Sequence, residues 1–283
     1  MTIQWFPGHM AKARREVTEK LQLVDVVIEL LDARIPMSSR NPLIDEIVKQ
    51  KPRLILLNKS DLADPQLVES WIVHFKKLGF EAIAISSTNG KGLAGIPKLT
   101  ENLIADKREA MKKRGINPRA VRAMILGIPN VGKSSLINRL ANKSIAKTGD
   151  RPGVTKGQQW IRIGKTLELL DTPGILWPKF EDQLVGYRLA ATGAVKDELL
   201  HFDDIALYII DYFKNNYPEN LMKRFSLAEL ADDKVKIIED IGRRRGCLIS
   251  GGEIDFDKAS EIIVRELRSG NLGRFCLEKP AEV

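Results

Sequence analysis

The sequence predicts two domains, an α/β domain with a mostly parallel six-stranded sheet and an all-helical domain after it. Up to about residue 175, short apolar runs alternate with segments of helical spacing, as in a sheet flanked by helices. After Pro178 the apolar residues follow helical spacing alone. The chain of 283 residues is long enough for two cores. We therefore expect domains over residues 1–178 and 179–283.

Six apolar segments are expected to form the strands of the sheet. They cover residues 24–32, 53–58, 81–86, 122–127, 159–163 and 167–171. Near-continuous apolar strands that are separated by helices indicate parallel pairing with both faces of the sheet buried. Gly164 and Lys165 lie between the last two segments and predict a hairpin turn.

Four segments predict the helices of the second domain. They include residues 181–191, 205–213, 235–242 and 259–267, which all show helical spacing of apolar side chains. Asp255 and Asp257 resemble signals for a helix N-terminus, whereas Gly242, Gly246 and Gly270 resemble helix stops.

Composition favours a protein of the cytoplasm with no membrane span. No N-terminal apolar segment resembles a signal peptide, and no apolar run approaches the roughly 20 residues that cross a bilayer. The two cysteines, Cys247 and Cys276, lack zinc-type spacing and suit a reducing compartment. The net charge of +8 is compatible with a polyanionic partner or with a solvated basic surface. The longest basic segment runs from Lys107 to Arg122.

The segment G-I-P-N-V-G-K-S-S, from Gly127 to Ser135, follows a predicted strand and opens a helical pattern. This context is typical of a P-loop, in which glycines let backbone N–H groups surround phosphates. Lys133 would reach the β- and γ-phosphates, and Ser134 would offer a hydroxyl to Mg²⁺. The alternative is a chance glycine-rich turn. The nucleotide-binding residues expected here are Asn130, Val131, Gly132, Lys133, Ser134 and Ser135.

Two further loops predict recognition of guanine. N-K-S-D, from Asn58 to Asp61, follows the second strand, and the Asp61 carboxylate can accept hydrogen bonds from the guanine N1–H and amine. Asn58 would complement the base or brace the loop, and the Lys59 stem can cover the ring. S-S-T after the third strand offers backbone amides to guanine O6, from Ser86, Ser87 and Thr88.

D-T-P-G, from Asp171 to Gly174, predicts contacts with Mg²⁺ and the γ-phosphate. Asp171 would join the Mg²⁺ shell through a water molecule, and the Gly174 amide would bind the γ-phosphate. Thr155 is placed to supply a second hydroxyl to Mg²⁺, although loop threonines are commonly just solvated. Together, the five motifs predict binding of GTP and GDP with Mg²⁺.

These motifs occur in an unusual order. Ras-like chains begin with the P-loop and end with the guanine loops, whereas here the guanine loops come first. Loops at the carboxyl ends of parallel strands hold the ligand, so the chain order can change without moving the site. The sequence therefore predicts a circularly permuted P-loop GTPase domain. Its γ-phosphate sensor leads directly into the helical domain.

The permuted order, together with P-G-H-M (7–10), D-A-R-I-P (32–36) and the nucleotide motifs, resembles the circularly permuted ribosome biogenesis GTPase A family. The resemblance runs over nearly the whole chain and departs only in S-S-T for the commoner S-A-x. It implies hydrolysis of GTP to GDP and phosphate by an assembly factor for the large (50S) ribosomal subunit, stimulated by that particle. It also implies contact with ribosomal RNA through the helical domain, with ribosomal proteins as possible further partners.

The residue that handles the attacking water is not obvious from the motifs. Ile175 follows Gly174, where Ras-like enzymes carry a glutamine close by. An imidazole can orient water instead, and the family resemblance implies this role for His9 of P-G-H-M. The plain alternative is a solvated histidine at a helix start. Our hypothesis is that docking on a ribosomal particle brings His9 to the γ-phosphate, where it acts beside Lys133.

Asn130 has two interpretations. Potassium-activated GTPases carry asparagine at this place, where its oxygen helps to hold K⁺ beside the β- and γ-phosphates. A turn-forming asparagine after proline explains the residue equally well.

Six arginines of the helical domain are candidates for RNA contacts. Three close a helix, where cations also favour the helix dipole, so RNA is not the only explanation for their charge. Structured RNA is recognised largely through its backbone and shape, which suits arginines that lack a stacking aromatic motif. A solvated basic face is the alternative. The candidates are Arg243, Arg244, Arg245, Arg265, Arg268 and Arg274.

Two other functions stay open at this point. One is a GTP-dependent RNA-binding switch in which hydrolysis is incidental, and the other is an RNA-modification partner with a GTPase switch. We expect a monomer.

Overall fold

The computed structural model describes residues 15, 17–142, 160–172 and 182–280. They form two compact units. One unit contains the sheet and also takes the C-terminal residues 278–280, and the other comprises residues 182–277. The sequence placed residues 278–280 with the helices, so the return of the chain to the sheet unit is a difference from our expectation.

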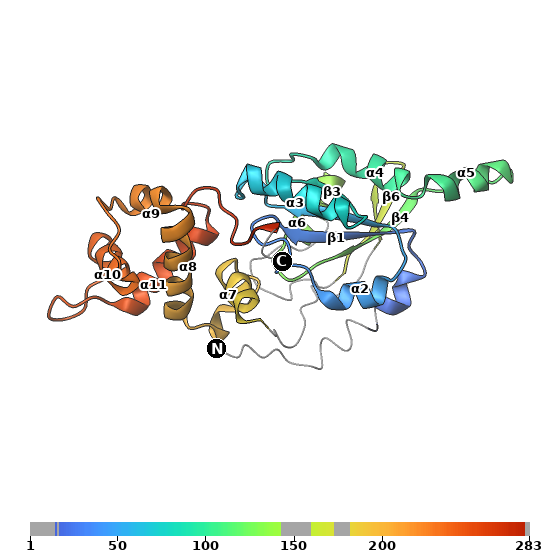
Figure 1. The fold of residues 1–283 in the computed structure, drawn as a ribbon. Helices are drawn as coiled ribbons and strands as arrows, with labels where there is room; N and C mark the ends of the chain where they lie inside the picture. The colour runs from blue at the N-terminus through green and yellow to red at the C-terminus, as the bar shows by residue number, and fades with distance from the viewer. Residues whose placement is uncertain (1–14, 16, 143–159, 173–181, 281–283) are drawn as a thin grey trace. The chain divides into compact units, whose positions relative to one another are not determined.

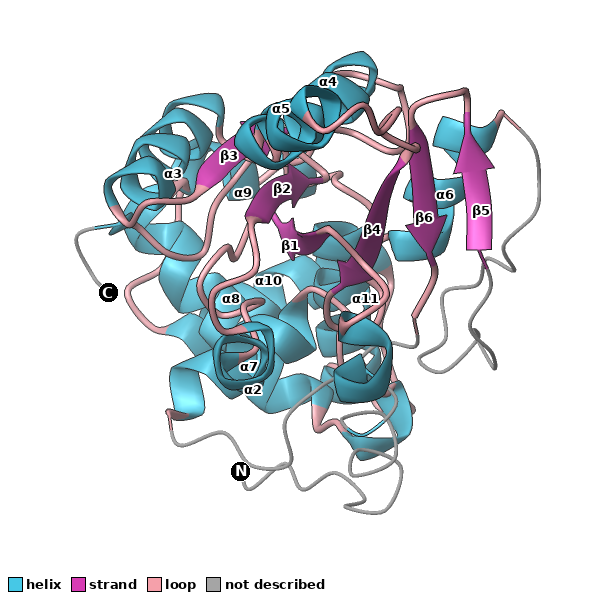
Figure 2. Cartoon of the chain, turned by 90° about the vertical axis from the view of Figure 1, so that its right-hand side faces the viewer, coloured by secondary structure: helices cyan, strands magenta, loops and turns pink. Residues whose placement is uncertain are grey.

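All six predicted strands are present in one sheet, in the order β3-β2-β1-β4-β6-β5 (Figure 2). Five strands are parallel, and β5 pairs antiparallel with β6. The carboxyl ends of the parallel strands therefore meet at one edge. The strands are β1 (Val26–Asp32), β2 (Arg53–Asn58), β3 (Glu81–Ala84), β4 (Val121–Leu126), β5 (Trp160–Ile163) and β6 (Leu167–Leu170).

The central strand β1 is buried along its whole length, and so is β2. Glu29, a buried acid in the middle of β1, lies 3.1 Å from Arg53 and 3.6 Å from Arg40. Burial raises the pKa of Glu29, and the two arginines oppose that shift. Both guanidinium groups also lie over the Phe80 ring. These contacts explain how a charged residue is tolerated inside an otherwise apolar strand.

Helices cover both faces of the sheet. Helices α3 and α4 lie on one face and α2 on the other (Figure 1). Asn41 and Asp64 cap α2 and α3 through their side-chain oxygens.

No helix in the described ranges is long and apolar enough to cross a bilayer. The helices of this unit are α2 (Pro42–Val48), α3 (Pro65–Lys77), α4 (Ile96–Asn102), α5 (Ala105–Lys113) and α6 (Lys133–Ala141), with a short 3-10 turn at Leu93–Gly95.

The second unit is helical, as predicted. Its longest helix, α8, packs against α7, α9, α10 and α11. The Phe213 ring of α8 lies 5.2 Å from that of Phe275, and Ile209 and Leu267 are buried in the same unit. The helices are α7 (Gln183–Ala191), α8 (Phe202–Asn216), α9 (Pro218–Phe225), α10 (Lys234–Arg245) and α11 (Phe256–Arg268), with a 3-10 turn at Asp197–Leu199.

The predicted helix ends are confirmed with one exception. The Asp255 side chain caps α11, and Gly246 ends α10 in the left-handed conformation, as Gly270 does directly after α11. Gly242 is wrong as a stop, because it lies buried inside α10. A Cβ at Gly242 would lie 2.8 Å from a methyl carbon of Ile254, so close packing accounts for this glycine.

The C-terminal tail is fastened to the loop after β1. The buried carboxylate of Glu278 accepts hydrogen bonds from the backbone N–H groups of Met37 and Ser38 and from the Ser38 hydroxyl. The Trp71 indole of α3 donates to the Glu278 carbonyl at 3.4 Å. Residue 278 therefore ties a helix and a loop of the sheet unit together.

Candidate functional site

The P-loop connects β4 to α6 at the carboxyl edge of the sheet. Both of its glycines are required by space, and Gly132 is also required by its backbone conformation. Gly132 has a φ of 99°, and a Cβ there would lie 2.4 Å from the Asn58 side-chain nitrogen. A Cβ at Gly127 would lie 2.6 Å from the Leu30 carbonyl oxygen. The loop therefore runs against β1 and β2 with no room for a side chain at either place.

Lys133 is the first residue of α6 and is buried. Its ammonium donates to the carbonyl oxygens of Gly127 and Ile128, at 3.0 and 2.8 Å. Burial lowers the pKa of Lys133 to about 8, although Asp171 opposes this shift. The ammonium is held within the P-loop, where phosphate oxygens would stabilise its charged form.

Asp171 follows β6 and is also buried. Burial raises the pKa of its carboxyl group, and Lys133 opposes that change. Within the described ranges, its Oδ1 atom has no hydrogen-bond partner. A buried carboxylate oxygen without a donor fits a cation ligand, and oxygen is the ligand that Mg²⁺ prefers. Ser134, in the first turn of α6, is partly exposed.

Asn58 joins the P-loop to the loop after β3. Its side-chain nitrogen donates to the Val131 carbonyl at 2.8 Å and to the Ser87 hydroxyl at 3.1 Å. Its side-chain oxygen accepts from the Ser87 amide at 2.9 Å. Of the two roles we considered, Asn58 has the bracing one.

Asp61 occupies the end of the N-K-S-D loop. Its Oδ1 atom is buried, and no described residue donates a hydrogen bond to it. Such an oxygen is costly to leave unpaired, so it is suited to the two donors on the Watson–Crick edge of guanine. The loop itself is anchored by the Ser60 amide, which donates to the Ile85 carbonyl at 3.1 Å.

The S-S-T loop presents fewer free amides than the sequence suggested. The Ser86 amide donates to the Lys91 carbonyl and the Ser87 amide to Asn58. Thr88 is exposed, and no hydrogen bond from its amide to a described residue is present. Of these three amides, that of Thr88 is the one available to guanine O6.

Asp32 and Arg34 form a buried pair that sequence reasoning did not assign to the site. The guanidinium donates to both carboxylate oxygens, at 2.9 and 2.7 Å, and the Lys59 ammonium lies 3.0 Å from the same carboxylate. Burial opposes ionisation of Asp32, but Arg34 and Lys59 outweigh it and hold the pKa of this carboxyl well below its usual range. Asp32 thus fixes the lysine of N-K-S-D. The sequence signal for this pair is an acid and a base two positions apart, Asp32 and Arg34, at the end of a strand.

Several predicted site residues lie outside the described ranges, namely His9, Thr155, Gly174 and Ile175. Asn130 is described and has a φ of 57°, in the left-handed region that turn-forming asparagines tolerate. This conformation accounts for an asparagine at this position. Val131 is buried beside it, and Ser135 is exposed on α6.

The six arginines of the helical unit divide into two groups. Arg245 lies 3.7 Å from Glu266, and Arg265 pairs with Glu261. Arg268 donates to the Ala190 and Ala191 carbonyls and pairs with Asp197. These three have partners within the helical unit. The other three are exposed and form no ion pair with a described residue, and they are Arg243, Arg244 and Arg274.

Comparison with known proteins identifies the family. A family described as "50S ribosome-binding GTPase" matches residues 122–240. The ribosome biogenesis GTPase A of Bacillus cereus is 59% identical, over 100% of this chain and 95% of the relative. That of Thermotoga maritima is 31% identical, over 99% and 96%. The crystal structure of GNP-bound YlqF from T. maritima shares 29% identity with a TM-score of 0.66, over 95% and 98%. The chain therefore belongs to the ribosome biogenesis GTPase A family of GTP-hydrolysing enzymes.

Proposed function

We propose that this chain hydrolyses GTP as an assembly factor for the large (50S) ribosomal subunit, and that the ribosomal particle accelerates hydrolysis. The observation that carries the nucleotide site is the bridge from Asn58 to Val131 and Ser87, which joins the phosphate loop to the base loops. The ribosomal role is supported by the family description and by the names of the relatives.

In this site the two ends of GTP are bound by different groups. Lys133 and the P-loop amides hold the phosphates, while Asp61 and the Thr88 amide recognise guanine. Lys59, fixed by Asp32, lays its stem against the base. Because Asp61 accepts two donors that adenine does not offer, the site selects GTP over ATP.

Mg²⁺ is expected beside Asp171, Ser134 and Thr155. The unpaired buried oxygen of Asp171 fits a first- or outer-sphere contact with a hard cation. Held by these residues, Mg²⁺ would supply positive charge beside the β- and γ-phosphates. Asn130 is the proposed contact for K⁺, and comparing turnover in KCl and in NaCl at equal ionic strength tests it.

His9 is the proposed group that orients the attacking water. Ile175 cannot do this by hydrogen bonding, so intrinsic hydrolysis should be slow until a partner positions His9. The His9→Ala variant should keep wild-type GTP affinity and lose particle-stimulated turnover. Stimulated turnover that stays unchanged in this variant contradicts the role.

The exposed arginines of the helical unit are the proposed contacts with ribosomal RNA. Arg243, Arg244 and Arg274 have no acidic partner among the described residues, so their charges remain available to phosphates. Binding through them should weaken steeply as salt rises. Arg245 and Arg268 make internal contacts, and we expect their replacement to lower stability as well as RNA affinity, whereas the exposed pair of Arg265 with Glu261 should contribute little to stability.

The test of the function is GTP turnover with and without purified large-subunit assembly intermediates, with small-subunit particles as the control. Stimulation by the large-subunit particle alone supports the proposal. Equal low turnover in all three conditions, with nucleotide-dependent binding intact, favours the regulatory switch instead. Stimulation by tRNA favours the RNA-modification partner. The protein is proposed to act as a monomer in the cytoplasm.

A further inference from the structure

Helix α5 leaves the sheet unit as a separate arm. It spans Ala105–Lys113, has no buried residue and extends away from the sheet (Figure 1). The helix comes before β4, so it lies at the amino ends of the parallel strands, and the P-loop follows the other end of β4. The arm is therefore remote from the nucleotide site.

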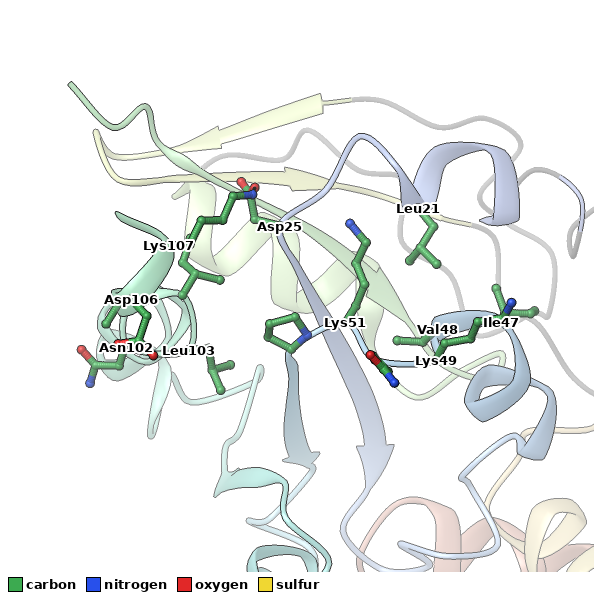
Figure 3. A pocket seen from close by; sticks show the side chains of 14 residues that line it. Leu21, Asp25, Ile47, Val48, Lys49, Lys51, Asn102, Leu103, Asp106 and Lys107 are labelled. Atoms are coloured by element: carbon green, nitrogen blue, oxygen red, sulfur yellow. Dashed lines mark hydrogen bonds and ion pairs between the residues drawn. The ribbon is translucent and has the colours of Figure 1, made fainter. Parts of the chain in front are cut away.

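The base of this arm is fastened by ion pairs. Lys107 lies 2.8 Å from Asp25, and Arg119, on the returning segment, lies 2.9 Å from the same carboxylate. Figure 3 shows Lys107 and Asp25 side by side at the pocket beside the helix. Arg108 lies 3.6 Å from Glu101 and donates to the Arg119 carbonyl at 2.9 Å. The basic residues near the base therefore have structural partners.

The tip differs from the base. Lys112, Lys113 and Arg114 are exposed, and no ion pair with a described residue is present for any of them. Gly115 then reverses the chain in the left-handed conformation, and Ile116 follows with an exposed side chain. Three successive cations thus stand at the far end of the arm, and none of them forms an ion pair with a described residue.

Folding energetics do not account for this tip. An isolated helix shorter than about 12 residues is marginal in water, and α5 gains no burial to compensate. Arg108 and Lys112 lie one turn apart, where like charges cost about 0.2–0.5 kcal/mol. Glu109 and Lys113 also lie one turn apart, and their opposite charges offset a similar amount of free energy. The arm is kept in place by its base, and its tip adds charge without adding packing.

We propose that the tip of α5, formed by Lys112, Lys113 and Arg114, binds the phosphate backbone of double-helical RNA. The inference rests on the proposed function. It adds an RNA contact on the sheet unit to the contacts proposed for the arginines of the helical unit. Phosphate contacts need free cations and no apolar surface. Protein interfaces instead centre on buried aromatic and apolar anchors. Single-stranded RNA needs aromatic stacking platforms, which are absent from α5.

The experiment compares the wild type with the Lys112→Gln/Lys113→Gln/Arg114→Gln variant. The matched control removes three exposed lysines of α3 and α4 through Lys76→Gln, Lys77→Gln and Lys98→Gln. Affinities for a generic RNA duplex, a single-stranded RNA and the large-subunit particle are measured over a range of KCl concentrations. Intrinsic GTP turnover and the far-UV circular dichroism spectrum are recorded for all three proteins.

The tip variant should bind the duplex about tenfold or more weakly, and its salt slope should fall by about three, one for each lost phosphate contact. Intrinsic turnover should stay at the wild-type value, because the arm lies at the opposite edge of the sheet from the P-loop. The control variant should keep most of the affinity and the slope.

Three outcomes would overturn the proposal. Equal affinity and slope in the tip variant and the wild type exclude a phosphate contact. Loss of particle binding with unchanged duplex binding assigns the tip to an acidic protein surface. A greater loss on single-stranded RNA excludes the duplex. If large-subunit particles neither bind nor stimulate the wild type, the proposed function fails, while the duplex measurement still decides whether the tip binds RNA.

Discussion

Asn58 connects segments that are far apart in the chain. It reaches the Val131 carbonyl, 73 positions away, and the Ser87 hydroxyl, 29 positions away. The motif alone predicted that this residue matters, but not which of its two roles it has. The neighbouring Asp61 has an unpaired buried oxygen, so it is the residue through which base recognition can be tested directly.

Asp61→Asn should change the preferred base. Loss of two hydrogen bonds to a charged acceptor, at about 1.5–3 kcal/mol each, should weaken GTP binding by about 100-fold or more. Xanthine carries a carbonyl oxygen where guanine has its amine, and the new amide can donate to it. XTP should therefore bind more tightly than GTP in competition against a fluorescent nucleotide.

The control for this variant is Asp64→Asn in the same loop. Asp64 caps α3, and asparagine is an equally good cap. This change should leave both nucleotide affinities near wild type. GTP affinity that survives in Asp61→Asn would exclude Asp61 from base recognition.

Lys133 should make nucleotide affinity depend on pH. Its pKa is lowered to about 8 by burial, with Asp171 in opposition. The nucleotide phosphates favour the ammonium form, so nucleotide binding raises the pKa of Lys133. Above about pH 8, where the lysine of the free protein has lost its proton, binding therefore takes up a proton. Affinity for GDP should be constant below about pH 7.5 and fall by up to about tenfold per unit above about pH 8.

Titration calorimetry in buffers of different ionisation enthalpy measures this proton uptake. The range from about pH 6.5 to about pH 8.5 is used, because guanine N1–H itself ionises at more alkaline pH. Proton uptake near zero at the alkaline end of this pH range would mean that Lys133 is fully charged before the nucleotide binds.

Among the elements, α11 is fastened to its neighbours through one acid. Glu266 accepts from Arg224 of α9 at 2.6 and 2.7 Å, and Arg245 of α10 lies 3.7 Å away. Hydrogen bonds from Arg224 lower the pKa of Glu266, while burial opposes the shift. This contact joins three helices.

Glu266→Gln should destabilise the helical unit by about 1–2 kcal/mol at neutral pH. Because the folded-state pKa of Glu266 is lowered, its contribution is present above the ordinary value of 4.5 and is lost as pH falls below it. The variant should therefore lose stability to urea at pH 7 and depend less on pH in the acid range than the wild type.

Glu261→Gln on the same helix is the matched control. Its partner Arg265 is exposed, and exposed pairs contribute about 0–1 kcal/mol. A Glu261→Gln variant that is as unstable as Glu266→Gln would show that any charge on α11 matters equally.

The sequence predicted elements better where a single physical cause dominated. The five parallel strands are near-continuous apolar runs and the Gly164-Lys165 turn marks the antiparallel pair of β5 and β6, so all six strands were found, and Asp255 marked its helix start correctly. Gly242 was misread because a glycine that permits close packing looks the same in sequence as one that ends a helix. The contact of Glu278 with Ser38 had no local signal, since its partners lie 240 positions away.

At the scale of the whole molecule, each unit has its own buried core. The sheet unit buries β1 and β2, and the helical unit buries α8 against its neighbours. The nucleotide motifs within the described ranges all fall in the sheet unit. The order of those motifs was enough to predict the permutation, because strand ends and not chain order define the site.

We expect two thermal transitions in scanning calorimetry, of which saturating GDP with Mg²⁺ raises only one. A ligand at 100 times its Kd stabilises the unit that binds it by about 2.7 kcal/mol. The Lys133→Ala variant should show the same two transitions without the shift. A single transition that moves as a whole with nucleotide would contradict separate folding units.

The bond between Ser38 and Glu278 has a consequence for biosynthesis. The two residues are separated by 240 positions, so at about 5–20 residues per second their syntheses are roughly 12 to 48 s apart. Over that interval the loop after β1 lacks the carboxylate that pairs its amides, while strands β2 to β6 and the helical unit are translated. A chain that stops before Glu278 lacks this contact, so the Met37 and Ser38 amides gain their carboxylate partner only after the helical unit has been translated.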